Sequence, residues 1–136
     1  MARWSAKALR DVPMVEQEVP GDPEWFPLQH HFGLSAFGVN VYVASAAGDQ
    51  LLERHDETES GQEELYLVVA GVAQFEVDGE QVRAEAPFVV AVTDPAVRRE
   101  ARALEVGTTV VALGGEPHER FESSWQSHHF EGVPRA

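Results

Sequence analysis

The feature that most constrains the fold is a series of short strand-like segments between residues 36 and 114, separated by turn signals and without a convincing helix. Residues 36–44 (AFGVNVYVA) alternate between apolar and small or polar side chains, the period of two that is typical of a strand. Residues 72–84 alternate in the same way around Asp78-Gly79, which predicts a type I′ hairpin because both central positions of that turn need positive φ. Short strands at this spacing predict an all-β fold, an antiparallel sandwich or barrel.

Further strands are predicted along the same region. LLERH (51–55) leads into an acidic loop, EELYLVVAG (63–71) is strongly apolar, and FVVAV (88–92) should form a short buried strand. VRREARA (97–103) and TTVVALGG (108–115) complete the series. Strand signals begin at residue 28, so His30 and His31 fall in a predicted edge strand, where a surface or interface role is expected.

The length predicts a single domain over residues 1–136, with three parts. Residues 1–27 contain several prolines and should form an N-terminal arm over the main body, anchored by Trp25 and Phe26. Residues 28–114 form the barrel, and residues 115–136 form a C-terminal tail that is either a short helix or a loose arm. Trp125 and Phe130 in this tail should cap the barrel or a partner subunit, and His118, His128 and His129 should be solvated.

Composition limits the classes of partner and chemistry. The formal net charge of −13 repels phosphate backbones and anionic membranes, so we expect neither nucleic-acid nor membrane binding. The absence of cysteine excludes disulfides, thiolate metal sites and a cysteine nucleophile. No apolar signal segment and no apolar run of about 18 residues is present, which predicts a soluble, cytoplasmic protein.

The run from Gly48 to Gly71 resembles the first motif of the cupin family, which reads Gly, His-x-His, Glu, six residues and Gly with gaps between. Here His55-Asp56-Glu57 stands in the His-x-His position, and Glu64 is followed by six residues and then Gly71. An alternative alignment gives the two histidine positions to Glu57 and Glu59. The wider pattern is similar to small single-domain bacterial cupins with no established activity. The resemblance implies an antiparallel β-barrel or jelly roll of the cupin type.

Cupin metal sites combine imidazoles with a carboxylate, and these ligands suit iron, manganese, nickel or zinc. In the second motif, VTDPAVRREAR (92–102) places Arg98 at the position of the third histidine, whereas the alternation of Val97, Ala101 and Ala103 points Arg99 inward instead. An arginine cannot bind a metal, since it has no acceptor and keeps its proton. The resemblance therefore implies a site with these ligand-binding candidates: His55, Glu57, Glu64, Tyr66, Arg98 and Arg99.

Two hypotheses follow for this site. In the leading one no cofactor is bound, an arginine pairs with Glu57 or Glu64, and the barrel takes a small polar or acidic ligand without catalysis. In the alternative, His55, Glu57 and Glu64 hold a divalent transition metal, the arginine binds a carboxylate or phosphate of the ligand, and the protein is an enzyme of the oxygenase or isomerase type. In either case a homodimer is expected, because residues 25–43 are rich in Trp, Phe, Leu and Val. A third possibility is an interaction module that dimerises through its arms.

Overall fold

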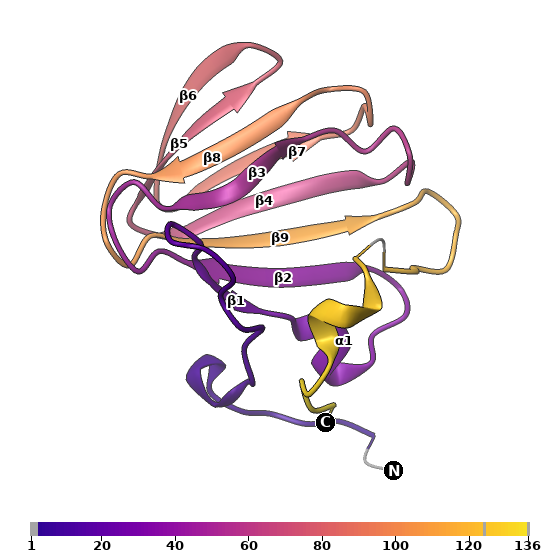
Figure 1. The fold of residues 1–136 in the computed structure, drawn as a ribbon. Coiled ribbons are helices and arrows are strands. Elements are labelled where there is room, and N and C mark those ends of the chain that lie inside the picture. Colours follow the sequence, from indigo (N-terminus) through magenta and orange to yellow (C-terminus); the bar gives the residue numbers. More distant parts are fainter. Residues whose placement is uncertain (1–2, 124, 136) are drawn as a thin grey trace.

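The computed structural model describes residues 3–123 and 125–135, which form two antiparallel sheets packed face to face (Figure 1). Five strands in the order β1-β2-β9-β4-β7 make one sheet, and four in the order β3-β8-β5-β6 make the other. The first sheet contains β1 (Glu24–Phe26), β2 (Gly38–Val43), β9 (Thr109–Gly115), β4 (Glu63–Ala70) and β7 (Phe88–Val92). The second contains β3 (Gln50–His55), β8 (Arg99–Ala103), β5 (Val72–Val77) and β6 (Glu80–Glu85). The predicted all-β jelly roll is confirmed.

The core lies between the two sheets. Inward residues of β4 and β5 are its largest members, with Tyr66 and Val68 each 1% exposed and Phe75 fully buried. Small residues on β8 and β6, such as Ala101 and Ala84, let the second sheet approach closely. The outer face of this sheet carries charged pairs, including Arg54 with Glu76.

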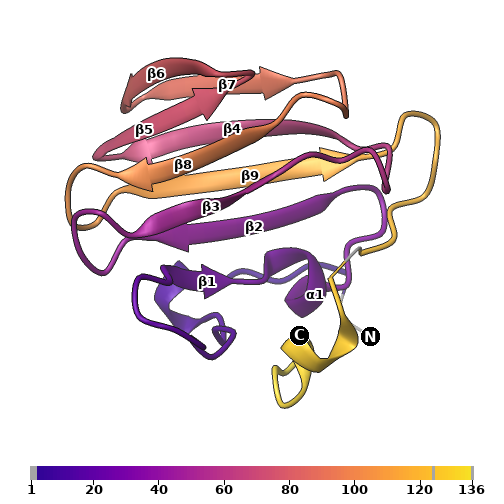
Figure 2. The same ribbon diagram turned by 45° about the horizontal axis from the view of Figure 1, so that its top comes forward.

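A second apolar cluster lies on the outer side of the five-stranded sheet. Val12 and Phe26 pack on Val41 of β2, and the 3₁₀ helix Leu9–Asp11 and helix α1 (Leu28–Phe32) add apolar side chains. The less apolar face of β2, with Asn40 and Tyr42, therefore faces the space between the sheets. The N-terminal segment thus covers part of the sheet, and Figure 2 shows it below β1 and β2.

The hairpin at Asp78-Gly79 is confirmed, since both residues have positive φ, 52° and 80°, between the paired strands β5 and β6. The predicted edge strand at His30 and His31 is wrong, because these residues lie in α1. Pro27 precedes this helix, and Gly33 ends it in the left-handed conformation, φ 67°. Proline near the start and glycine just after the end are both common in helices.

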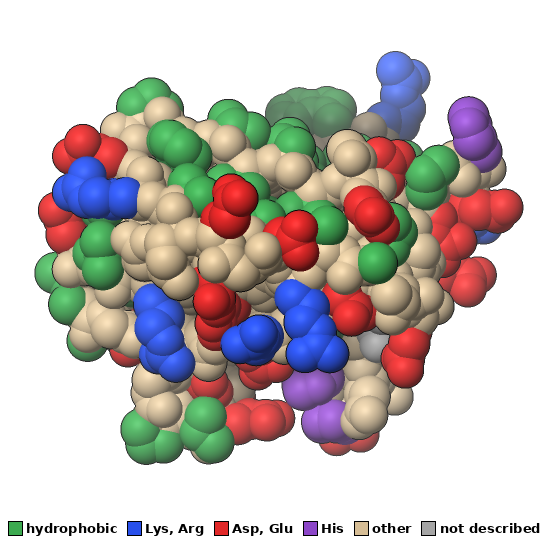
Figure 3. Space-filling view, turned by 90° about the horizontal axis from the view of Figure 1, so that it is seen from above, with side chains coloured by type: hydrophobic (Ala, Val, Ile, Leu, Met, Phe, Trp, Pro, Cys, Tyr) green, Lys and Arg blue, Asp and Glu red, His purple; other side chains and the backbone are tan. Residues whose placement is uncertain are grey.

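Two other expectations need correction. β7 is present but only one face of it is buried, because Val89 is 56% exposed on the outer side of the sheet. Strand structure also begins earlier than residue 28, since β1 pairs with β2 and Val15 forms an isolated bridge with Trp25. Seen from above, acidic and basic side chains lie interspersed on the surface, with hydrophobic side chains distributed among and around them (Figure 3).

The C-terminal tail turns back beside α1 (Figures 1 and 2). It includes a 3₁₀ helix, Ser127–Phe130, and is held by His30 and His31 of α1. The His31 ring donates from Nδ1 to the Pro134 carbonyl oxygen at 2.6 Å, and His30 Nε2 lies 3.0 Å from the Val133 carbonyl oxygen. His31 is 2% exposed, so it is a buried anchor and not the surface residue predicted.

Candidate functional site

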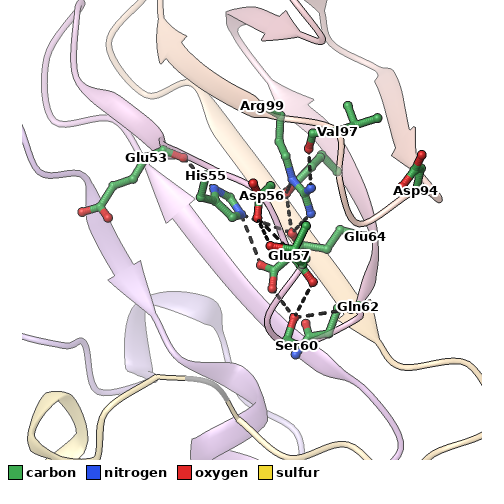
Figure 4. Close-up of polar contacts among 12 residues, drawn as sticks. Glu53, His55, Asp56, Glu57, Ser60, Gln62, Glu64, Asp94, Val97 and Arg99 are labelled. Carbon is green, nitrogen blue, oxygen red and sulfur yellow. Dashed lines mark hydrogen bonds and ion pairs between the residues drawn. The ribbon is translucent and has the colours of Figure 1, made fainter.

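The site lies at the end of the sandwich where β3 ends and β4 begins. His55 is the last residue of β3 and is paired directly with Arg99, the first residue of β8. Glu64 lies at the start of β4, opposite Gly114 of β9, in the other sheet. Side chains from both sheets therefore meet at this open end (Figure 4).

Glu64 is the centre of a hydrogen-bond network. One of its carboxylate oxygens, Oε1, accepts from the Arg99 guanidinium, from the Tyr66 hydroxyl at 2.7 Å, and lies 3.3 Å from His55 Nε2. The Arg99 Nε donates to the Tyr66 hydroxyl at 3.0 Å and its Nη1 to the Val97 carbonyl oxygen at 2.8 Å. Arg99 is 1% exposed, so a buried ion pair joins the two sheets.

The loop after β3 brings a second carboxylate to His55. Asp56 starts the loop by accepting from the Thr58 backbone N–H at 3.1 Å, and Gly61 closes it with φ 71°. Glu57 then lies with one carboxylate oxygen 3.3 Å from His55 Nε2 and the other bonded to the Ser60 hydroxyl. His55 is held by its own Nδ1, which lies 2.6 Å from the Glu53 carbonyl oxygen and donates to it.

The network shifts the protonation equilibria of its members. Burial disfavours the imidazolium, but the hydrogen bonds to Glu57 and Glu64 outweigh it and raise the pKa of His55 to about 10. Burial likewise disfavours the Glu64 carboxylate, but bonds from His55, Tyr66 and Arg99 outweigh it and lower the pKa of Glu64 to about 2. Burial, with the nearby Glu64 carboxylate, raises the pKa of Tyr66. At neutral pH the Glu64 carboxylate thus faces two cations, Arg99 and the His55 imidazolium.

The structure brings together five of the six predicted site residues: His55, Glu57, Glu64, Tyr66 and Arg99. Arg98 points outward with its side chain 67% exposed, 3.9 Å from Asp56. The inward arginine is therefore the one favoured by strand alternation. Glu59, from the alternative alignment, is exposed and lies outside the carboxylate–imidazole cluster.

The cluster opens into a cavity of about 580 Å³. Its wall includes Trp25 from β1, Tyr42 from β2 and, from the tail, Trp125 and Phe130. Arg98 and Arg99, predicted as ligand-binding residues, do not belong to this wall, since the donors of Arg99 are directed at Glu64, Tyr66 and Val97. Alternation with Asn40 indicates the face of the strand on which Tyr42 lies, but no local pattern indicates that the tail returns to Trp25.

Three acidic or histidine ligand atoms lie within 4.8 Å of one another at two places in the described residues. One is the cluster of His55, Glu57 and Glu64. The other is Glu18 with His128 and His129 at the tail, where Glu18 and His128 are exposed. The first group is the one predicted as a candidate metal site.

Comparison with known proteins shows which fold the chain has. Neither a protein-family model nor a curated protein matches the sequence. An RmlC-like cupin from Shewanella frigidimarina is 15% identical, with a TM-score of 0.62 over 88% of this chain and 95% of that chain. The chain has the cupin fold.

Other cupin-fold structures carry more specific names. A sugar phosphate isomerase from a cupin superfamily, from Silicibacter pomeroyi, is 16% identical, with a TM-score of 0.65 over 89% of this chain and 83% of that chain. A Streptomyces protein whose structure contains uridine is 14% identical, with a TM-score of 0.60 over 90% of this chain and 95% of that chain. These likenesses concern the fold. No helix in the described part of the chain is long and apolar enough to cross a membrane.

Proposed function

We propose that this cupin binds a small molecule in its barrel cavity and that the Arg99–Glu64 ion pair stands in place of a metal centre, without catalysis. The observation that carries the proposal is the buried Arg99 guanidinium, which donates to Glu64 beside the carboxylate–imidazole cluster. A guanidinium has five N–H donors and no acceptor, and its positive charge opposes a divalent cation nearby.

The donor set fits a metal poorly. His55, Glu57 and Glu64 offer three ligand atoms within 4.8 Å of one another, but Glu64 Oε1 already takes part in bonds with Arg99, Tyr66 and His55. The Glu64 carboxylate is balanced by Arg99 and a protonated His55. A divalent cation would have to displace the proton of His55 and would leave the buried arginine beside a positive ion.

The cavity supports binding of a small molecule. Its volume of about 580 Å³ lies in the range of ordinary ligand sites, and its wall combines aromatic rings with a few converging polar groups. The structure of a Streptomyces protein with a similar fold was determined with uridine, which is a small molecule. The extension to this chain is part of our proposal.

The second candidate is a metal-dependent enzyme of the oxygenase or isomerase type. It is favoured by the close approach of His55, Glu57 and Glu64 and by the bond from His55 Nδ1 to a carbonyl oxygen, which is how a metal-binding histidine is commonly oriented. An isomerase has also been named among the structures of this fold.

Melting curves with and without metal test the proposal against this alternative. We expect the melting temperature of the wild type to be the same in buffer, in EDTA and with excess manganese or zinc, because no metal contributes to its stability. A wild type that loses several degrees in EDTA and regains them with metal would support the second candidate. Ligand binding is tested on the same protein by a melting-temperature screen of cationic, neutral and anionic small molecules, and no stabilisation by any of them would contradict the binding function.

A further inference from the structure

Acidic side chains outnumber cationic ones in the wall of the cavity, where His55 is bonded to Glu57 and Glu64. Among the described residues that line it there is no lysine or arginine. Glu57 and Glu64 lie at its inner end, half-buried, and six more acidic residues belong to the wall: Glu16, Glu18, Asp22, Glu53, Asp56 and Glu59. With a formal net charge of −13 on the whole chain, the field in the cavity disfavours an anion and favours a cation.

The two nearby arginines, Arg98 and Arg99, do not contribute positive charge to the wall that a ligand would contact. Arg99 is buried behind the wall, and its guanidinium is engaged by Glu64, Tyr66 and the Val97 carbonyl oxygen. Arg98 is on the outer surface beside Asp56. Neither arginine belongs to the described wall, so no guanidinium lines the cavity to pair with a carboxylate or phosphate of a ligand.

The wall of the cavity also contains aromatic rings. The rings of Trp25 and Trp125 lie 4.7 Å apart at 47°, and Tyr42 lies 6.2 Å from Trp25. Trp25 donates from Nε1 to the side-chain oxygen of Asn40 at 2.8 Å, which satisfies its polar atom and fixes the orientation of the ring. A carboxylate lies near these rings, since Glu18 is 3.8 Å from His129, whose ring is 5.6 Å from that of Trp25. Aromatic faces combined with negative charge are the usual recognition surface for ammonium groups.

We infer that the ligand of this cavity is an organic cation, a small molecule with an amine or quaternary ammonium group held between the Trp25–Trp125 pair and the acidic wall. The inference rests on the proposed function, since it names the chemical class of the ligand for the same cavity. It differs from the polar or acidic ligand predicted from the sequence, because the described wall contains many carboxylates and no arginine. The class is defined by charge and ring contacts, so primary and quaternary amines are both included.

The test uses probes of matched shape and different charge on the full-length protein. Choline carries a quaternary nitrogen, 3,3-dimethylbutan-1-ol has carbon in its place and no charge, and 3,3-dimethylbutanoate is an anion of similar size. By titration calorimetry we expect choline to bind at least about tenfold more tightly than the alcohol, and more weakly as salt is added. Binding of the alcohol or the anion as tight as that of choline would overturn the cation class and leave the binding function intact.

Variants locate the binding surface. We expect Trp125→Leu to weaken choline binding about fivefold or more and Trp125→Phe, which keeps an aromatic face, to weaken it less. Trp4→Leu is the matched control, because Trp4 is 78% exposed and does not line the cavity. Glu18→Gln should also weaken choline binding, and Glu80→Gln, an exposed glutamate outside the wall, should not.

Two further outcomes would contradict the inference or part of it. Equal losses in Trp125→Leu and Trp4→Leu would overturn the placement of the cation against the aromatic pair. No binding of choline or of simple primary amines at millimolar concentration would overturn the inference itself. In that case, stabilisation by neutral or anionic compounds in the melting screen would still support the proposed binding function. No stabilisation by any compound would contradict both the cationic ligand and the proposed binding function.

Discussion

At the scale of single residues, Glu64 is the side chain on which the site depends. Three donors converge on one of its oxygens from two sheets, and one of them is the buried guanidinium of Arg99. A buried ion pair of this kind contributes little net stability by itself, but the loss of one partner leaves an uncompensated charge in the interior. Its removal is therefore the most informative change in the site.

We expect Glu64→Gln to lower the free energy of unfolding by about 3–5 kcal/mol, because the Arg99 guanidinium loses its carboxylate. Chemical denaturation measures this change. Glu63→Gln is the matched control, since the neighbouring Glu63 is exposed, and it should change the free energy by less than about 0.5 kcal/mol. The double variant Glu64→Gln with Arg99→Met should recover part of the loss. Equal stability of Glu64→Gln and Glu63→Gln would mean that Glu64 is a solvated carboxylate.

The same network predicts a pH dependence. The pKa of Glu64 is lowered from 4.5 to about 2, so the stability it contributes is present above about pH 4.5 and is lost as the pH falls towards 2. The pKa of His55 is raised from 6.5 to about 10, so its contribution is complete below about pH 6.5 and is lost as the pH rises towards 10. Denaturation at a series of pH values should show both declines, and His55→Gln should reduce the alkaline one. An alkaline limb that is identical in His55→Gln and wild type would contradict the assignment.

At the scale of elements, the structure explains why a glycine, Gly71, ends the cupin-like motif. Its φ is 72°, and a Cβ at this position would lie 2.7 Å from the Thr108 Cα in the turn before β9. Both the conformation and the space are therefore restricted to glycine between β4 and β5.

We expect Gly71→Ala to lower the free energy of unfolding by about 1–3 kcal/mol more than Gly79→Ala. Gly79 is the control because its φ is also positive, 80°, while nothing lies within 4 Å of its Cβ position. Denaturation of the two variants separates the effect of conformation from that of crowding. Similar losses in both variants would show that the contact with Thr108 does not matter.

The elements also show what the sequence could and could not predict. Period-two alternation and the Asp-Gly turn located the strands of the sandwich, because these signals are local. The cupin spacing indicated His55, Glu57 and Glu64, and alternation in VRREARA favoured Arg99 as the inward arginine. The tail could not be placed, because its contacts with α1 and Trp25 join residues about a hundred positions apart along the chain. Helix α1 was missed because its one turn is too short to show a helical period.

At the scale of the whole molecule, the outer face of the five-stranded sheet is only partly covered. The N-terminal segment covers β2, which removes part of the reason for a dimer through residues 25–43. Val69 on β4 and Val89 on β7 are 54% and 56% exposed.

A homodimer remains our prediction, with the exposed patch around Val69 and Val89 as the expected contact. Light scattering should give twice 15.0 kDa for the wild type and a smaller mass for Val89→Glu. A wild-type mass of 15.0 kDa would contradict it.

We propose above all that the Arg99–Glu64 ion pair, and not a metal, occupies the centre of this site. Elemental analysis of protein purified without chelator tests it most directly. We expect less than about half an equivalent of iron, manganese, nickel and zinc combined, because the guanidinium of Arg99 opposes a divalent ion beside Glu64. A content near one equivalent of any of these metals, lost in Glu64→Gln and retained in Glu63→Gln, would contradict the claim and establish the metal-dependent alternative.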